Sequence, residues 1–225
     1  MATTTATRLE PGLVDHCVEL RGIDWNGYLT MLRLRGEYSR PKLVYLDGTL
    51  YMMSPSFLHE RLKERLGLFV MVVVEELDIP CIVAGETTFR RRSKRGGVEP
   101  DKSFYLTHEA LVRGKNDLHL RTDPPPDLAV EAVNTHDPGP AVTVLKRFRV
   151  PEIWVGDEEG VRILVRRANG RYVASETSLA FPFLSALEIA DWVLRPQAGS
   201  DTDWIKELRR WVNEVLAPRY RARSE

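Results

Sequence analysis

Hydrophobic residues recur along this chain at the two spacings that strands and helices require. Residues 42–53 hold two short apolar runs joined by Asp47-Gly48, and an Asp-Gly pair between such runs is a strong signal for a β-hairpin. After Ser54-Pro55-Ser56, a stripe with the 3.6-residue period predicts a long helix over residues 58–77, with Leu62, Leu66, Phe69, Val70, Val73 and Leu77 on its apolar side.

The chain beyond residue 100 continues this mixture of elements. Apolar runs predict strands over residues 103–106, 128–133 and 152–155, and a hairpin over residues 161–174. Helices are predicted over residues 141–149, 185–194 and 204–215. Because there is no internal repeat and no second core, the sequence predicts one mixed α/β (α+β) domain.

The two ends of the chain differ from the rest. Residues 1–21 are Thr-rich at the start and contain Pro11-Gly12, so they predict a flexible N-terminal tail. The domain is expected over residues 22–195. Residues 196–225 hold the last helix, whose apolar face predicts packing on the domain or on a second copy of the chain.

One acidic residue lies inside an apolar strand. Leu128, Ala129 and Val130 precede Glu131, and Ala132-Val133 follow it. An unpaired carboxylate in such a strand costs several kcal/mol or takes up a proton, so Glu131 needs a partner. Asp101 is the expected companion, since it begins a second strand after Pro100.

Two acids on neighbouring strands can share one divalent cation, because strands lie about 4.8 Å apart. The alternative is a purely structural role, in which Glu131 pairs with a buried arginine and Asp101 caps a turn. The spacing alone favours neither reading.

The helix over residues 58–77 opens with His59-Glu60. His59 belongs to its apolar stripe and Glu60 to its flank, so His59 is expected at the edge of the core and Glu60 as a favourable charge at the helix N-terminus. The alternative is a metal ligand at Glu60 and an accessory role for His59. His136 is interpreted as a loop residue.

The charges of the chain cancel, since 32 basic residues face 32 acidic ones. No global field therefore draws the protein to nucleic acid, and contact with phosphates must come from a local patch. The dense basic run directly before the Asp101 strand is either a solvated loop or such a phosphate-binding patch; it contains Arg90, Arg91, Arg92, Lys94 and Arg95.

The absence of a targeting signal and the spacing of the cysteines predict a cytoplasmic location. Cys17 and Cys81 are isolated and have no metal-ligand spacing, which is typical of a reduced compartment. No apolar run is long enough for a signal peptide or a membrane span, so no membrane partner is expected.

An aspartate after proline, a loop, and a glutamate in an apolar strand together resemble the PD-(D/E)XK nuclease superfamily. More narrowly, the chain resembles the Uma-two family of restriction-endonuclease-like proteins between about residues 41 and 192. The stretches that carry this resemblance are Tyr45 to Leu50, Met53-Ser54-Pro55, His59-Glu60, Glu99-Pro100-Asp101, Pro125 to Glu131 and Val150 to Trp154.

The resemblance implies a restriction-endonuclease-like core, in which a central mixed sheet is flanked by helices, with an N-terminal hairpin and a C-terminal helix. It also implies Mg²⁺ or Mn²⁺ held by Asp101, Glu131 and the backbone carbonyl of Ala132, with Glu99 as a candidate accessory residue. A lysine usually completes the motif, but Val133 stands at its simplest position.

The missing lysine leaves its replacement open. Relatives in the Uma-two family carry the lysine on the helix after the strand that holds the glutamate. In this chain, counting back from Val150 places that position near Ala141, and counting forward from Glu131 places it near Leu145 or Lys146. Lys146 is the best candidate by residue type. The acidic residue that the family carries before the hairpin glycine is also replaced, with Lys42-Leu43 in that region.

These observations lead to a metal-dependent endonuclease as the first hypothesis, acting on DNA rather than RNA and working as a homodimer if it cuts both strands. A nuclease-fold protein without catalysis, which only binds nucleic acid or a partner, is the second. A purely structural acid pair is the third.

Overall fold

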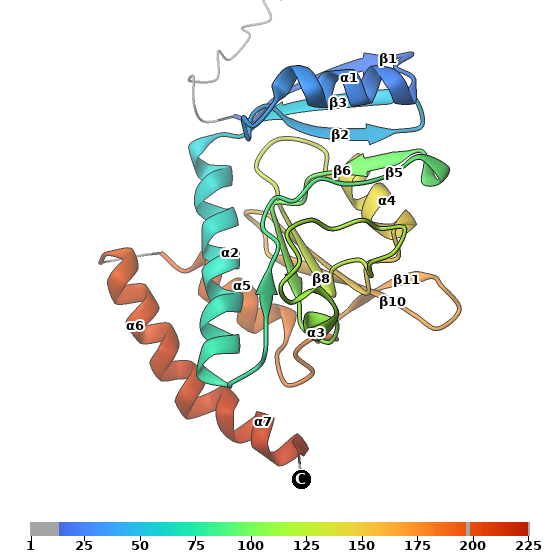
Figure 1. The fold of residues 1–225 in the computed structure, drawn as a ribbon. Coiled ribbons are helices and arrows are strands. Elements are labelled where there is room, and N and C mark those ends of the chain that lie inside the picture. The colour runs from blue at the N-terminus through green and yellow to red at the C-terminus, as the bar shows by residue number, and fades with distance from the viewer. Residues whose placement is uncertain (1–13, 197–198, 225) are drawn as a thin grey trace, which may run out of the picture.

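Two β-sheets and seven α-helices make up the part of the chain that the structure describes, residues 14–196 and 199–224 of a computed structural model (Figure 1). The first sheet has the strand order β1-β3-β2-β6-β5 and is antiparallel throughout. Its strands are His16–Arg21 (β1), Lys42–Leu46 (β2), Thr49–Ser54 (β3), Phe89–Arg91 (β5) and Gly96–Val98 (β6).

The second sheet has the order β11-β10-β9-β8-β7-β4, and the parallel pair β8–β9 makes it mixed. Its strands are Ile82–Val83 (β4), Lys102–Tyr105 (β7), Leu128–Ala132 (β8), Glu152–Gly156 (β9), Val161–Arg166 (β10) and Tyr172–Ser175 (β11). The helices are Trp25–Arg35 (α1), Phe57–Glu76 (α2), Glu109–Val112 (α3), Gly139–Arg147 (α4), Ala186–Leu194 (α5), Asp201–Trp211 (α6) and Ala217–Ser224 (α7).

Helices cover both faces of the second sheet. Leu128, Val130 and Ala132 of β8 join the core that contains α2 and α5, whereas Ala129 joins the core around α4. Because side chains alternate across a strand, Glu131 belongs to the α4 face. The predicted class, a central mixed sheet flanked by helices, is confirmed.

The N-terminal hairpin forms as predicted, with β2 and β3 joined at Asp47-Gly48. Asp47 has a φ of 51° and Gly48 a φ of 94°, which are the left-handed conformations that a tight two-residue hairpin turn demands. The turn therefore fixes the register in which β2 faces the rest of the molecule.

The tail prediction is wrong for residues 16–21, because they form β1 and pair with β3 from His16 opposite Ser54 to Arg21 opposite Thr49. Every side chain of β1 is exposed, so this edge strand is held by backbone hydrogen bonds to β3 and leaves no buried apolar pattern in the sequence. The rest of the predicted tail, residues 1–13, lies outside the described residues.

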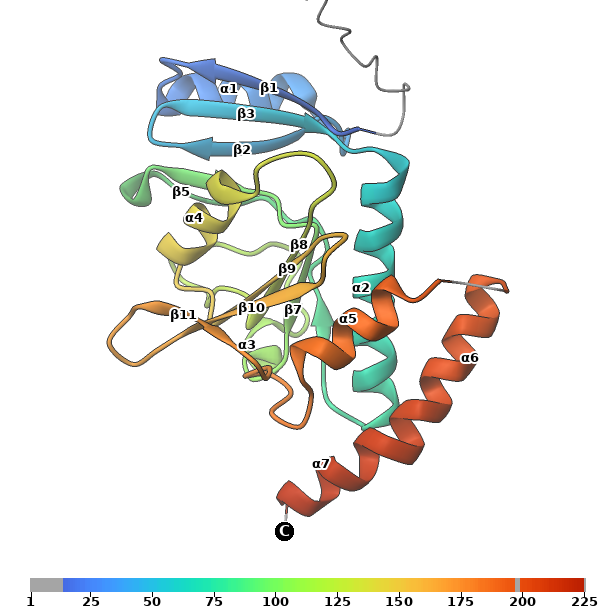
Figure 2. The same ribbon diagram turned by 180° about the vertical axis from the view of Figure 1, so that it is seen from behind.

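Helix α6 runs beside α2, and α7 leads away from it (Figure 2). Trp204 and Leu208 of α6 are buried in the same core as Phe69 of α2, and Arg209 pairs with Glu75 at 2.7 Å. A five-residue π turn, Val212–Leu216, continues α6 into α7. Within residues 14–196 and 199–224, no helix combines the length and the apolarity needed to cross a membrane.

Close contact between α1 and β6 holds the first sheet in place. Tyr28 is fully buried, its ring stacks on Tyr45 at 4.9 Å, and a Cβ added to Gly97 would lie 2.2 Å from the Tyr28 hydroxyl oxygen. Gly97 is therefore required by the close approach of the ring, and β6 leads directly into Glu99-Pro100-Asp101.

We expect Gly97→Ala to lower the free energy of unfolding by about 1–3 kcal/mol, because the buried Tyr28 ring must shift. Gly160→Ala is the matched control, since a Cβ there meets no atom within 4 Å, and it should change stability by less than about 0.5 kcal/mol. Urea unfolding of both variants measures the difference, and equal stabilities would contradict the role given to this contact.

Candidate functional site

Asp101, the residue directly before β7, lies opposite Glu131 of the neighbouring strand β8. The β7–β8 register pairs Lys102 with Val130, so the next positions outward are Asp101 and Glu131, with their side chains on the same face. Both are buried, with 2% and 1% of their surface exposed. The Ala132 N–H donates to Asp101 Oδ2 at 2.8 Å, which fixes the aspartate against the end of β8.

The cation between the two acids is Lys42, which comes from the other sheet. Its Nζ lies 2.6 Å from Asp101 Oδ1 and 3.3 Å from Glu131 Oε2, and the residue is 5% exposed. The buried partner that the sequence required is therefore a lysine rather than an arginine. One oxygen, Glu131 Oε1, is buried without a hydrogen-bond partner.

Lys42 reaches the acids because the side chains of β2 alternate between the two faces of the strand. Leu43 and Tyr45 pack under α1, whereas Val44 and Leu46 pack against the core around α4, and Lys42 shares their side of the strand. A cavity of about 30 Å³ beside Lys42 and Glu131 is also lined by Pro140 and Ala141. Ala141, one of the positions where counting placed the family's lysine, thus lies near the acids without an ammonium.

Sequence reasoning missed Lys42. The only sign in that region was the replacement of an acidic residue that the family carries. The signal that could have found the residue is its place in the alternation of β2, because a lysine on the inner face of a strand must meet a carboxylate to remain charged.

The charges of Lys42 and Asp101 stabilise each other, whereas the charge of Glu131 is disfavoured at this place. Burial alone would raise the pKa of Asp101, but Lys42 and His59 bring it well below its ordinary value. Burial and the neighbouring Asp101 raise the pKa of Glu131, against the effect of Lys42. The two carboxylates overcome the burial of Lys42 and raise the pKa of its ammonium, so Lys42 stays protonated.

His59 links this group to a second cluster. Its Nε2 lies 3.2 Å from Asp101 Oδ1, and its Nδ1 lies 3.5 Å from Asp15 Oδ2. His136 Nδ1 lies 2.9 Å from the same Asp15 oxygen. The imidazole of His59 is therefore between two carboxylates, which raise its pKa to about 9 although burial opposes this.

The other predicted acids lie elsewhere. Glu60 forms ion pairs with Arg40 and Lys63, each at 2.8 Å, and no described contact joins it to Asp101. Glu99 accepts hydrogen bonds from Arg35 at 2.6 Å, from Thr88 at 2.6 Å and from the Leu43 N–H at 2.9 Å. Glu99 thereby fastens β2 to the segment that enters the site.

Lys146 is not brought to the acids. Its Nζ lies 5.7 Å from the centre of the Tyr172 ring, and the described contacts include none with Asp101 or Glu131. The carbonyl of Ala132 as a metal ligand stays a prediction.

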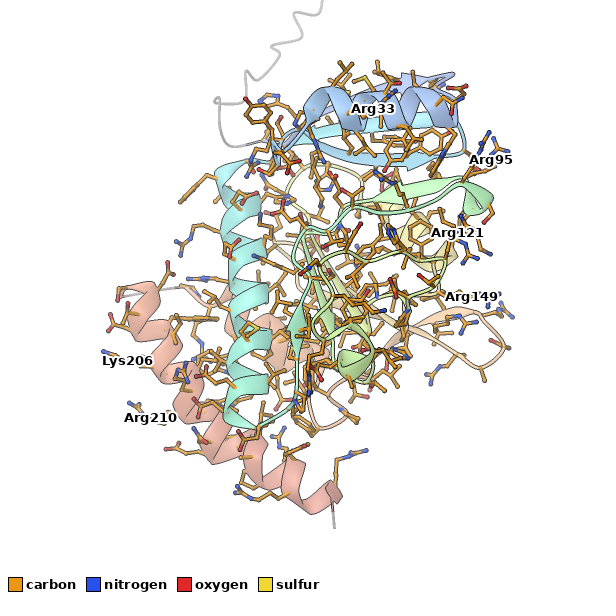
Figure 3. All side chains as sticks on the ribbon, viewed as in Figure 1. Arg33, Arg95, Arg121, Arg149, Lys206 and Arg210 are labelled. Carbon is orange, nitrogen blue, oxygen red and sulfur yellow. The ribbon has the colours of Figure 1, made fainter. Side chains whose placement is uncertain are left out.

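The basic run begins in β5 with Arg90 and Arg91 and continues as the turn between β5 and β6. Arg90, Arg91 and Arg92 line a groove of about 1160 Å³ with Trp25 and Arg121. Arg95 and Arg121 project from the same side of the molecule in Figure 3. Arg95 also lies 3.4 Å from Asp47 of the hairpin turn, and the Arg147 side chain caps the Lys94 carbonyl.

The raised pKa of His59 predicts that the metal-free protein loses stability as the pH rises. The folded chain holds the His59 proton up to about pH 9. An unfolded chain releases it near pH 6.5. This contribution is complete below pH 6.5 and should fall by about 2–3 kcal/mol between pH 6.5 and 9.

Urea unfolding in EDTA at these two pH values measures the change. His59→Gln is the control, because it removes the titrating group and should flatten this part of the pH profile. A profile equally steep in both proteins would assign the loss to another group.

Comparison with known proteins gives a family for this chain. No curated protein matches it. Among solved structures, it is similar to the crystal structure of a putative nuclease belonging to DUF820 from Anabaena variabilis ATCC 29413, with a TM-score of 0.49, 15% sequence identity and coverage of 72% of this chain and 97% of that one. The profile of the Uma2 family, described as "Putative restriction endonuclease", matches residues 25–197. Because this match spans most of the sequence, the chain belongs to the Uma2 family of restriction-endonuclease-like nucleases.

Proposed function

We propose that this protein is a metal-dependent endonuclease that hydrolyses phosphodiester bonds in DNA, with Asp101 and Glu131 holding Mg²⁺ or Mn²⁺ and Lys42 as the lysine of the site. The observation that carries the proposal is the pair of buried carboxylates on adjacent strands that share one ammonium, in a chain of a nuclease family. Lys42 replaces Lys146, the candidate by residue type, in this assignment.

The donors at the site fit a hard divalent cation. Carboxylate oxygens are the ligands that Mg²⁺ and Mn²⁺ prefer, and Glu131 Oε1 is a buried oxygen that lacks a partner. When bound there, such an ion would polarise a phosphoryl oxygen and lower the pKa of its water. Asp101 is oriented for this task by the Ala132 N–H and by His59.

Lys42 would position water and neutralise charge. Its ammonium is held by two carboxylates that raise its pKa, so it does not act as a base. In hydrolysis a water oxygen attacks phosphorus while one ester P–O bond breaks, and negative charge grows on the phosphoryl oxygens. A fixed ammonium beside the acids can donate to the attacking water and to those oxygens. The cavity of about 30 Å³ lined by Lys42 and Glu131 has room for a water molecule.

The groove lined by Arg90, Arg91, Arg92 and Arg121 is the proposed contact with the nucleic-acid backbone. Arginines bind phosphates and position a strand without reading its sequence. β6 connects this groove to the acids, and six residues of extended chain place Arg95 at most about 20 Å from Asp101. Bound nucleic acid could therefore extend from the groove to the scissile bond.

A second candidate is a nuclease fold that binds nucleic acid or a partner without cutting. It is favoured by the burial of the site, where Lys42, Asp101 and Glu131 are 1–5% exposed and the ammonium already neutralises the acids. In this reading Lys42 takes the place of the metal, whereas in the first reading a metal binds beside it. A homodimer stays a prediction under both readings.

We expect the purified protein to cut supercoiled plasmid in Mn²⁺ or Mg²⁺ and not in EDTA. Asp101→Asn, Glu131→Gln and Lys42→Met should each lower the rate by about 100-fold or more, because each removes a charge at the reacting phosphate. Lys146→Met is the matched control and should keep the wild-type rate.

Single-stranded oligonucleotides assayed beside the plasmid report which strand form is cut. Loss of activity in Lys146→Met with full activity in Lys42→Met would overturn the assignment of the lysine. No cutting of either substrate, together with DNA binding that the variants retain, would favour the binding module.

Lys42→Met should also show how much a cation between the acids contributes to the stability of the fold. Removing one member of a buried ion pair costs about 3–5 kcal/mol, since it leaves the remaining charges uncompensated. Mn²⁺ should restore stability in Lys42→Met more than it raises that of the wild type, because the ion can take the vacated place between the carboxylates. Thermal unfolding with Mn²⁺ or EDTA measures this, and a shift in Lys42→Met no larger than that of the wild type would count against an ion in the place that Lys42 vacates.

A further inference from the structure

Three segments far apart in the sequence bring Asp15, His59 and His136 together. One ligand atom from each residue lies within 4.8 Å of the others. The side chains of Asp15 and His59 are fully buried, and that of His136 is 10% exposed. Two imidazoles and one carboxylate form the donor set that divalent transition ions favour, in contrast to the all-oxygen donors of Asp101 and Glu131.

The distances between donors suit one ion. For bonds of about 2.0–2.1 Å, neighbouring ligands of a tetrahedral ion lie about 3.3 Å apart. Asp15 Oδ2 lies 2.9 Å from His136 Nδ1 and 3.5 Å from His59 Nδ1. Small adjustments of the side chains would bring all three atoms to one centre.

His59 has a nitrogen without a hydrogen bond at this place, although that nitrogen, Nδ1, lies 3.5 Å from Asp15 Oδ2. Its Nδ1 is buried and makes no hydrogen bond, while its Nε2 lies against Asp101 Oδ1. A histidine that ligates a metal usually presents its other nitrogen to a carboxylate, which fixes the tautomer and the ring orientation. Asp101 is that carboxylate for His59, so the ring is prepared to ligate through Nδ1.

Asp15 is held in position by the backbone around it. Its Oδ1 accepts a hydrogen bond from the Ser56 N–H at 2.8 Å, and its own N–H donates to Thr135 Oγ1 at 2.9 Å. The carboxylate is thereby oriented toward both histidines before any ion binds.

We propose that Asp15, His59 and His136 form a binding site for a divalent transition-metal ion, with Zn²⁺ as the best fit, separate from the nuclease ion at Asp101 and Glu131. The ion would join the residue before β1, the first turn of α2 and the loop that follows β8. His136 and Asp137 of that loop line the cavity beside Lys42 and Glu131, so the ion would hold this loop in place next to the acid pair. This inference does not rest on the proposed nuclease activity.

Full-length protein stripped with EDTA tests the proposal by calorimetric titration with Zn²⁺ and by the visible absorption of added Co²⁺. We expect one equivalent to bind and the Co²⁺ bands to indicate nitrogen and oxygen ligands. His136→Ala should weaken Zn²⁺ binding by at least about 100-fold, and so should Asp15→Asn. His119→Ala, which changes an exposed histidine elsewhere, should bind as the wild type does.

Glu131→Gln separates this site from the nuclease ion, because it should keep Zn²⁺ affinity even where cleavage is lost. Far-UV circular dichroism of His136→Ala and of the milder His136→Gln shows whether each variant is folded. Wild-type protein that binds no Zn²⁺ or Co²⁺, folded His136 variants that bind with unchanged affinity, or loss of binding in Glu131→Gln would each overturn the proposal. In the first case the three residues form only a hydrogen-bonded network.

Discussion

The ammonium of Lys42 between Asp101 and Glu131 is the interaction on which the site depends. Two carboxylates that face each other across neighbouring strands repel, and burial adds a large cost to each charge. A cation between them therefore stabilises the folded state, whatever the protein does with the acids. Since Lys42 belongs to the first sheet and the acids to the second, the same contact also joins the two sheets.

Other contacts around Lys42 serve the same geometry. Glu99 binds the backbone of Leu43 and the Arg35 side chain, so β2 and α1 are fastened to the segment that carries Asp101. Tyr28 fills the space above Gly97 on β6. A glutamate that the family motif suggested as an accessory residue thus acts by holding the strand that delivers the lysine, and it reaches the acid pair only through that strand.

The elements and the two acids could be predicted from the sequence because they leave local signals. Asp47-Gly48 predicted the hairpin, and the apolar stripe of α2 predicted its helix. The position of Glu131 inside an apolar strand marked it as a candidate site residue. The partners could not be predicted, since they depend on how the sheets pack. Lys42 lies 59 residues before Asp101, and His136 meets Asp15 across 121 residues. The exposed strand β1 was missed for a different reason, because its pairing depends on the backbone alone.

His59 makes the two clusters interdependent. The imidazole has one nitrogen on Asp101 and the other facing Asp15, so a proton or an ion at Nδ1 changes the hydrogen bond that Nε2 can make to Asp101. Asp101 also shares Lys42 with Glu131, and the chain of contacts therefore runs without a break from the loop of His136 to the buried acids. With neutral His59 protonated at Nε2, Asp101 receives a hydrogen bond and keeps its negative charge. With His59 doubly protonated, part of that charge is neutralised. The charge that Asp101 presents to a bound cation therefore depends on His59 as well as on Lys42, and the protonation of His59 depends in turn on Asp101 and Asp15.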